Sequence, residues 1–342
     1  FEGGATLKNS VADFTGQFTL AKSGVQIASV SGRPNLDDNV GSLTFAPTPI
    51  IFTPRTFQPY DLSPLLRGPA NVTGRADISG GANWSGEGMT ANATVDLRRI
   101  GFALATAGVF EGVSGKVEVA DLMNMKSAPG QTMTIDKVTL GLPIESGVIK
   151  FQLIGYDAIR IESAEWPFVG GLIRIRPTDF KFGETENRVI AQAVNWDLNQ
   201  IVDLFKIPDV KLNGVVGGDV PIVFSTGSAE IDNAQLQGTQ NGGVIQYTGS
   251  TGDAAAQSDS NAKMLFDALK DFRYKVLKVG IDGNFTGNIR LSLNLLGSNP
   301  DVLSGSEFDL NIAVDSPLMN LLNTTSQWKN MRSNVTAAPG PD

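Results

Sequence analysis

The chain has 342 residues and a formal net charge of −8, and it contains neither cysteine nor histidine. This composition excludes disulfides, thiolate nucleophiles, Cys/His zinc sites and histidine acid–base chemistry. The negative charge argues against nucleic acid as a partner and against a general electrostatic attachment to anionic lipid headgroups. Charged residues make up only 18% of the chain and glycine is abundant, which favours many strands joined by tight turns.

Residues 1–70 are predicted to form a β-rich part that ends in a proline-rich extended segment. The first strand-like runs are Leu7–Leu20 and Gly24–Val30. Prolines then recur through residues 46–70, where we expect extended chain with little regular ladder and one helical turn at Asp61–Leu66. These prolines are Pro47, Pro49, Pro54, Pro59, Pro64 and Pro69.

Residues 71–322 carry the strongest strand signal and are predicted to form one β-rich region. Short apolar runs bounded by turn residues recur there at fairly regular spacing, as in meandering antiparallel sheets. The predicted strands before residue 195 are Gly74–Ser79, Gly88–Leu97, Gly115–Val119, Thr132–Leu140, Gly147–Leu153, Ala158–Ser163, Gly171–Arg176 and Arg188–Ala193.

Only a few segments show helical spacing. The predicted helices are Leu198–Ile207 after an Asp197 cap, Ala262–Arg273 after Asp259 or Ser260, and a short Pro317–Leu322. The remaining 20 residues, 323–342, are polar with two prolines, and they are predicted to be disordered.

The clearest alternation of apolar and polar residues lies near the C-terminus, in Asn288–Leu296 and Glu307–Asp315. It predicts a sheet with one apolar and one polar face. Short helices cannot cover so many strands, so the sheet must fold over on itself or be covered by a ligand. The candidate residues of the apolar face are Val148, Phe151, Leu153, Ile173, Ile175, Ile289, Leu291, Leu293, Leu295, Phe308, Leu310, Ile312 and Val314.

Two readings of this apolar face stay open on the residues alone. Burial in a sandwich core is the ordinary fate of such side chains and is favoured, while a lipid-facing groove is the alternative. The tryptophans Trp84, Trp166, Trp196 and Trp328 are most simply core anchors, although a subset could line a groove mouth.

The segment Glu307–Asp315 is either an internal strand or an exposed edge that accepts a strand from a partner. In the second case its outward-facing positions would carry the contact. These are Glu307, Asp309, Asn311, Ala313 and Asp315.

No pattern in the sequence supports catalysis, a metal site or a cofactor. The glycine pairs fit no nucleotide-binding motif, and Asp37-Asp38 and Glu184/Glu186 lie in turn-rich polar context. No run approaches the roughly 18–20 apolar residues of a membrane span. Because the chain opens at Phe1 without methionine, we expect an excised part of a longer protein whose anchor lies elsewhere.

A set of ordered landmarks between about Ile51 and Leu322 resembles a known family, the C-terminal region of the YdbH family. That family belongs to the AsmA-like envelope proteins, which include TamB and YhdP. The landmarks are Phe57–Gly68, Val72–Asp77, Gly112–Glu118, Pro129–Gln131, Gly141–Pro143, Gly147–Gln152, Ala164–Gly171, Gly242–Tyr247, Ala268–Tyr274 and Leu296–Pro300.

The resemblance implies a long, curled antiparallel sheet, a taco-like groove lined with apolar side chains. It implies a non-enzymatic conduit that carries phospholipid acyl chains across the periplasm of a Gram-negative bacterium, between the inner and outer membranes. An N-terminal inner-membrane anchor and a small outer-membrane lipoprotein that extends the sheet by strand addition are implied as partners. The alternative is a structural or adhesive envelope β-sandwich or solenoid with a protein-filled core.

Overall fold

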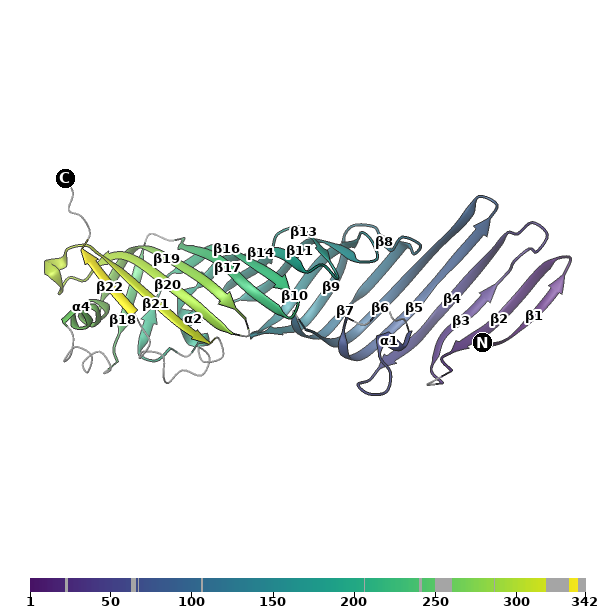
Figure 1. Ribbon diagram of the computed structural model, residues 1–342, viewed down its shortest axis with the longest axis horizontal. Coiled ribbons are helices and arrows are strands. Elements are labelled where there is room, and N and C mark those ends of the chain that lie inside the picture. The colour runs from purple at the N-terminus through teal and green to yellow at the C-terminus, as the bar shows by residue number, and fades with distance from the viewer. Residues whose placement is uncertain are drawn as a thin grey trace. The chain divides into compact units, whose positions relative to one another are not determined.

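The protein is mainly β, and its strands belong to one sheet in which they pair antiparallel (Figure 1). The computed structural model describes residues 1–21, 24–62, 66, 68–105, 107–205, 207–239, 242–249, 260–285, 287–317 and 332–337. The fold class predicted from the sequence, an antiparallel β-structure with short helices, is confirmed.

Contacts within the chain divide it into two compact units. Unit 1 comprises Phe1–Thr139, Pro143–Ala164 and Pro177–Glu184. Unit 2 comprises Leu140–Leu142, Glu165–Arg176 and Thr185–Asp342. Each unit is described by itself.

Unit 1 is an antiparallel meander in which each strand from β1 to β7 pairs with the next, and β7 also pairs with β8 and β9. Strand β11, whose last residues belong to unit 2, pairs with β13. The elements are β1 (Glu2–Lys8), β2 (Val11–Thr19), β3 (Gln26–Gly32), β4 (Gly41–Phe52), α1 (Pro59–Leu62), β5 (Ala70–Ser85), β6 (Gly88–Leu104), β7 (Gly108–Asp121), β8 (Lys126–Ser127), β9 (Gln131–Leu140), β10 (Leu142–Leu153), β11 (Ala158–Phe168) and β13 (Thr178–Lys181).

Two expectations for the first 70 residues are wrong. The run Leu7–Leu20 is a hairpin rather than one strand, because Asn9 and Ser10 adopt positive φ angles of 49° and 61° and form the two-residue turn between β1 and β2. Strand β4 also continues through Pro47 and Pro49. Beyond Ala46 it pairs only with β5, so prolines, which lack an N–H, cost no ladder bond on the β3 side.

Unit 2 has a second ladder, in the order β12–β14–β16–β17–β19–β20–β21–β22, with β18 pairing to both β19 and β15. The elements are β12 (Gly171–Ile175), β14 (Glu186–Asp197), α2 (Leu198–Leu204), β15 (Val210–Leu212), β16 (Val215–Ser225), β17 (Ser228–Gly238), β18 (Gly243–Tyr247), α4 (Ser260–Leu269), β19 (Phe272–Asn284), β20 (Asn288–Ser298), the 3-10 turn η2 (Leu303–Gly305), β21 (Phe308–Pro317) and β22 (Arg332–Ala337).

Both longer helices predicted from the sequence are present. The Asp197 carboxylate caps α2 by accepting hydrogen bonds from the backbone N–H groups of Asn199 and Gln200. Helix α4 ends at Leu269, earlier than expected, because Phe272 already begins β19. The alternative cap Asp259 and residues 318–322 of the third predicted helix lie outside the described residues.

Within the predicted tail, 323–342, the structure describes only 332–337. These residues form β22, which pairs with β21 from Phe308↔Ala337 to Ala313↔Arg332. The polar composition of this segment had predicted disorder and no strand.

None of the helices in the described ranges is long and apolar enough to cross a membrane.

Gln58 is a buried polar side chain in the loop that follows β4, and its hydrogen bonds attach this loop to strand β5. Its amide nitrogen donates to the carbonyl oxygens of Val72 (2.8 Å), Thr53 (3.0 Å) and Phe57 (3.0 Å), and its oxygen accepts from the Val72 N–H (2.8 Å). Phe57 beside it is buried and stacks on Phe52 with ring centroids 5.9 Å apart. The loop is therefore held by hydrogen bonds as well as by apolar packing.

Replacing Gln58 with leucine keeps most of the side-chain volume but removes the hydrogen-bond partner of the Val72 N–H and C=O groups. We expect Q58L to lose about 2 kcal/mol of unfolding free energy in urea titrations followed by circular dichroism. The matched control is Q17L at an exposed position of β2, for which the change should stay within about 0.5 kcal/mol. Equal losses in the two variants would contradict the anchoring role.

Candidate functional site

The apolar face of unit 2 is continuous from strand to strand. Because directly opposed residues in an antiparallel sheet share a face, the register defines rows of side chains across the ladder. One such row crosses β12, β14, β16, β17, β19, β20 and β21 and is apolar apart from one glycine. Its members are Ile173, Ala193, Gly218, Leu236, Val279, Leu293 and Ile312.

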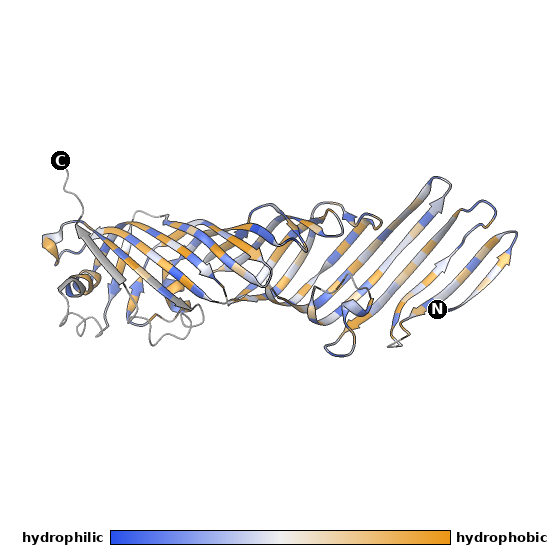
Figure 2. Cartoon of the chain, in the orientation of Figure 1, coloured by the Kyte–Doolittle hydropathy of each residue, from blue (hydrophilic) through white to orange (hydrophobic). Residues whose placement is uncertain are grey.

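The neighbouring row, one residue along each strand, lies on the opposite face and is polar or small throughout. Its members are Arg174, Gln192, Asp219, Gln235, Gly280, Ser292 and Ala313. Figure 2 shows the same alternation as bands of hydrophobic and hydrophilic colour along these strands. Unit 2 therefore has one apolar and one polar face, as the alternation in Asn288–Leu296 predicted.

Helix α4 covers part of the apolar face of unit 2. Its side chains Leu265, Ala268 and Leu269 belong to the same buried cluster as Phe272 and Phe308, whose ring centroids are 5.3 Å apart. The helix is tied to the sheet through a buried asparagine at the end of β20. This residue is Asn299, whose side-chain nitrogen donates hydrogen bonds to the carbonyl oxygens of Asp267 and Ala268 in the helix.

Several side chains of the apolar face are only partly buried. Leu291 and Leu293 lie in the middle of β20, with a strand on each side, yet both remain partly exposed. Ile281 on β19 and Ile222 on β16 are also partly exposed. By contrast, Leu295, Phe308 and Leu310 are completely buried. This face thus combines fully buried side chains with partly exposed ones.

Unit 1 repeats the same two-faced design. One apolar row crosses β1 to β6 and consists of Ala5, Phe14, Gly32, Leu43, Ala82 and Ala91. The adjacent row on the opposite face consists of Gly4, Thr15, Ser31, Thr44, Gly81 and Asn92. A further apolar row joins Ile78, Val95 and Val117 on β5, β6 and β7, and all three side chains are half-buried.

The polar face of unit 1 carries a network of ion pairs. Arg75 and Arg98 both contact Asp77, and Arg98 also pairs with Asp96 at 2.7 Å. On β11 the Arg160 guanidinium donates hydrogen bonds to Asp179, which holds the pKa of that carboxyl below its usual value. Such exposed pairs contribute little stability, but they make this face strongly hydrophilic.

Most of the candidate apolar residues from the sequence lie on these apolar faces. Strand β20 carries Ile289, Leu291, Leu293 and Leu295, and β21 carries Phe308, Leu310 and Ile312 opposite them. Ile173 and Ile175 on β12 belong to the same face, and Phe151 is buried on β10 with Leu153 half-buried two residues along. The Val314 side chain lies outside the described residues, although its backbone pairs with Leu291.

Val148 does not belong to this set. It is 42% exposed and lies three residues from Phe151, so strand alternation places it on the opposite face, with Lys150. Ile149 occupies the position on the Phe151 side. The error came from grouping residues by hydrophobicity without checking their parity along the strand.

Of the two predicted alternatives for Glu307–Asp315, the structure shows a strand that is paired on both sides over most of its length. Strand β21 is paired with β20 on one side and, from Phe308 to Ala313, with β22 on the other. The edge residues Asp309, Asn311 and Ala313 therefore already have a strand beside them, and Glu307 forms an ion pair with Lys275. Asp315 lies beyond the β22 pairing and forms an ion pair with Arg290.

In unit 1 the candidate residues predicted from the sequence were limited to Val148, Phe151 and Leu153 on β10, and the apolar rows of β1 to β7 were missed. The signal was present in Gly88–Leu97, where Ala91, Ala93, Val95 and Leu97 alternate with polar residues. Small alanine side chains made this alternation less conspicuous than the leucines of β20.

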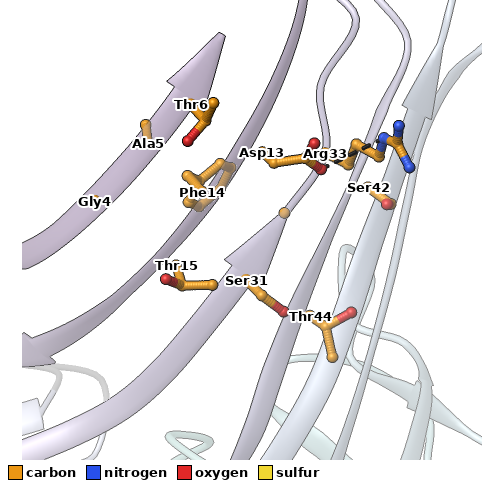
Figure 3. Close-up of a pocket in the computed structure, with 11 residues that line it drawn as sticks. Gly4, Ala5, Thr6, Asp13, Phe14, Thr15, Ser31, Arg33, Ser42 and Thr44 are labelled. Carbon is orange, nitrogen blue, oxygen red and sulfur yellow. Dashed lines mark ion pairs between the residues drawn. The ribbon is translucent and has the colours of Figure 1, made fainter. Parts of the chain in front are cut away.

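A hollow of about 580 Å³ lies on the polar face of β1 to β4 (Figure 3). It is lined mainly by short hydroxyl side chains, including Thr15, Ser31 and Thr44, and by the exposed ion pair of Arg33 with Asp13 at 3.4 Å. This lining does not suit acyl chains. In the described part of the chain, no group of three or more acidic side chains is placed to hold a metal ion.

The two faces can be distinguished with adjacent residues of one strand. L291D places a carboxylate on the apolar face, and we expect it to lose about 2 kcal/mol of unfolding free energy. S292D adds the same charge on the polar face of β20 and should change stability by less than about 0.5 kcal/mol. Both values can be measured by urea titration. A larger loss for S292D than for L291D would reverse the assignment of the faces.

Comparison with known proteins gives one match. The family model described as YdbH-like, intermembrane phospholipid transport protein YdbH, matches residues 5–337. No curated protein and no solved structure matches the chain.

Proposed function

Because the chain belongs to the YdbH-like family of intermembrane phospholipid transport proteins, we propose that its apolar faces carry phospholipid acyl chains. The observation that supports this proposal best is the apolar row from Ile173 to Ile312 in unit 2, in which Ile173 and Leu293 remain partly exposed. An apolar surface of this extent is favourable only when something other than water covers it.

Acyl chains would bind by burying methylene groups against the partly exposed side chains, each group gaining about 0.8 kcal/mol relative to water. Headgroups would stay in solvent. Successive rows are chemically alike, so a lipid meets no single deep well and can move along the face. The groove-like curl implied by the family resemblance, the inner-membrane anchor and a periplasmic location belong to this proposal.

The sheet suits this task because its backbone polar groups are paired within the ladders. Backbone N–H and C=O groups that face hydrocarbon must be paired, since an unpaired group costs several kcal/mol there. The ladder of unit 2 from β12 to β22 supplies these partners strand by strand, so only side chains vary the surface that lipid would meet. Catalytic groups have no place in such a mechanism.

Photocrosslinking tests the proposal directly. A benzophenone amino acid at position 291 or 95, on the two apolar faces, should give phospholipid adducts when the full-length protein is irradiated in cells. The matched controls are positions 292 and 94, which lie on the polar faces of the same strands. Adducts would be identified by mass spectrometry of the purified protein.

Equal adduct yields at all four positions, or none at any, would contradict the lipid conduit. Adducts with other residues of the chain at 291 and 95 would instead support the alternative of a protein-filled structural or adhesive sandwich.

A partner strand is the second part of the proposal. The family resemblance implies a small outer-membrane lipoprotein that extends the sheet, and β21 is covered by β22 over Phe308–Ala313. We propose that the partner takes the place of β22. Deleting residues 332–337 should then raise the yield of crosslinks between position 311 and the lipoprotein, because the edge is already free. A lower yield would indicate that the partner pairs with β22 instead.

A further inference from the structure

Trp166 on β11 is a buried side chain with an unused hydrogen-bond donor. Only 9% of the residue is exposed, and its indole Nε1 is the buried side-chain polar atom that finds no partner among the described residues. Trp196 provides the contrast, because its Nε1 donates to the Leu172 carbonyl oxygen at 2.9 Å. The two indoles therefore differ in whether the N–H group has a hydrogen-bond acceptor within the described part of the chain.

Trp166 lies on the apolar face. The turn Val169–Gly170, with positive φ angles of 41° and 77°, joins β11 to β12, and the Val169 carbonyl accepts a hydrogen bond from the Asp197 N–H. On the polar face, Glu165 pairs with Arg174 at 2.6 Å. Because side chains alternate along a strand, Trp166 lies on the opposite face, the one to which Ile173 belongs.

An unpaired N–H in an apolar environment lowers stability, because the donor gives up water without replacement. A phenylalanine would fill a similar space without that penalty. The indole of Trp166 is therefore suited to an acceptor that the described part of the chain does not supply and that enters an apolar surface.

We propose that the Trp166 indole N–H donates a hydrogen bond to an ester carbonyl of a diacyl phospholipid bound on the apolar face. The ester carbonyls are the acceptors nearest to the acyl chains, whereas phosphate and headgroup oxygens stay in water. This inference rests on the proposed function and refines it: Trp166 recognises the linkage between chain and glycerol, at one point of an otherwise uniform surface.

The test compares a short-chain diacyl phosphatidylethanolamine with the dialkyl ether lipid of the same chain length, which lacks both carbonyls. Binding to the purified 342-residue chain would be measured by isothermal titration calorimetry below the critical micelle concentration. We expect the unaltered protein to prefer the ester lipid about fivefold, the value of one hydrogen bond. In W166F the preference should disappear, while affinity for the ether lipid stays the same.

W196F is the matched control, because it removes an indole donor that already has a protein acceptor. It should keep the ester preference and unfold at a lower temperature, whereas W166F should be at least as stable as the unaltered protein. These melting temperatures show whether each variant is folded.

Two results would overturn the inference alone: equal binding of both lipids by the unaltered protein, or an ester preference that survives in W166F. Binding of neither lipid would overturn the inference and the proposed function together.

Discussion

Strand register is the constraint on which the rest of this structure depends. Side chains alternate with a period of two, so a slip of one residue between neighbouring strands would exchange the apolar and polar rows. The row that joins Leu236, Val279, Leu293 and Ile312 exists only because each ladder keeps its register. Several ladders contain bulges, for example between Ile231 and Ala234, yet Ile231 and Ala234 are both buried in the apolar cluster. The bulges thus shift the register without exchanging the faces.

The helices explain why the apolar faces are not uniformly buried. Helix α4 completes the core around Phe272 and Phe308, and α2 adds Leu198 to the same cluster. On β19 and β20 the side chains of Ile281, Leu291 and Leu293 keep part of their surface exposed. In unit 1 the loop at Phe57 and Gln58 plays a similar local role, and Ile78, Val95 and Val117 remain half-buried. An apolar face on which some side chains are buried and others are partly exposed is consistent with lipid binding over the exposed ones.

Much of this arrangement could be predicted from residue order. Alternation in Asn288–Leu296 identified the two faces, and Asp197 marked the start of α2. Other features depend on pairing partners and could not be read locally: Pro47 and Pro49 fit in β4 because the strand is unpaired on the β3 side there. Strand β22 was missed because its mainly polar sequence carries no clear apolar alternation, and its strand conformation depends on pairing with β21. Whether protein or lipid covers an apolar row is likewise a property of the folded sheet and could not be predicted from residue order alone.

Spin labelling tests the central claim most directly. The chain has no cysteine, so a nitroxide can be attached to a single introduced cysteine at position 291, 292 or 293. Power-saturation EPR then reports collisions with oxygen, which dissolves in acyl chains, and with a nickel chelate, which stays in water. In the lipid-loaded protein, we predict that labels at 291 and 293 collide with oxygen but not with nickel, and that the label at 292 shows the reverse. Labels at 291 and 293 shielded from both reagents would show that protein fills the face, and would contradict the account.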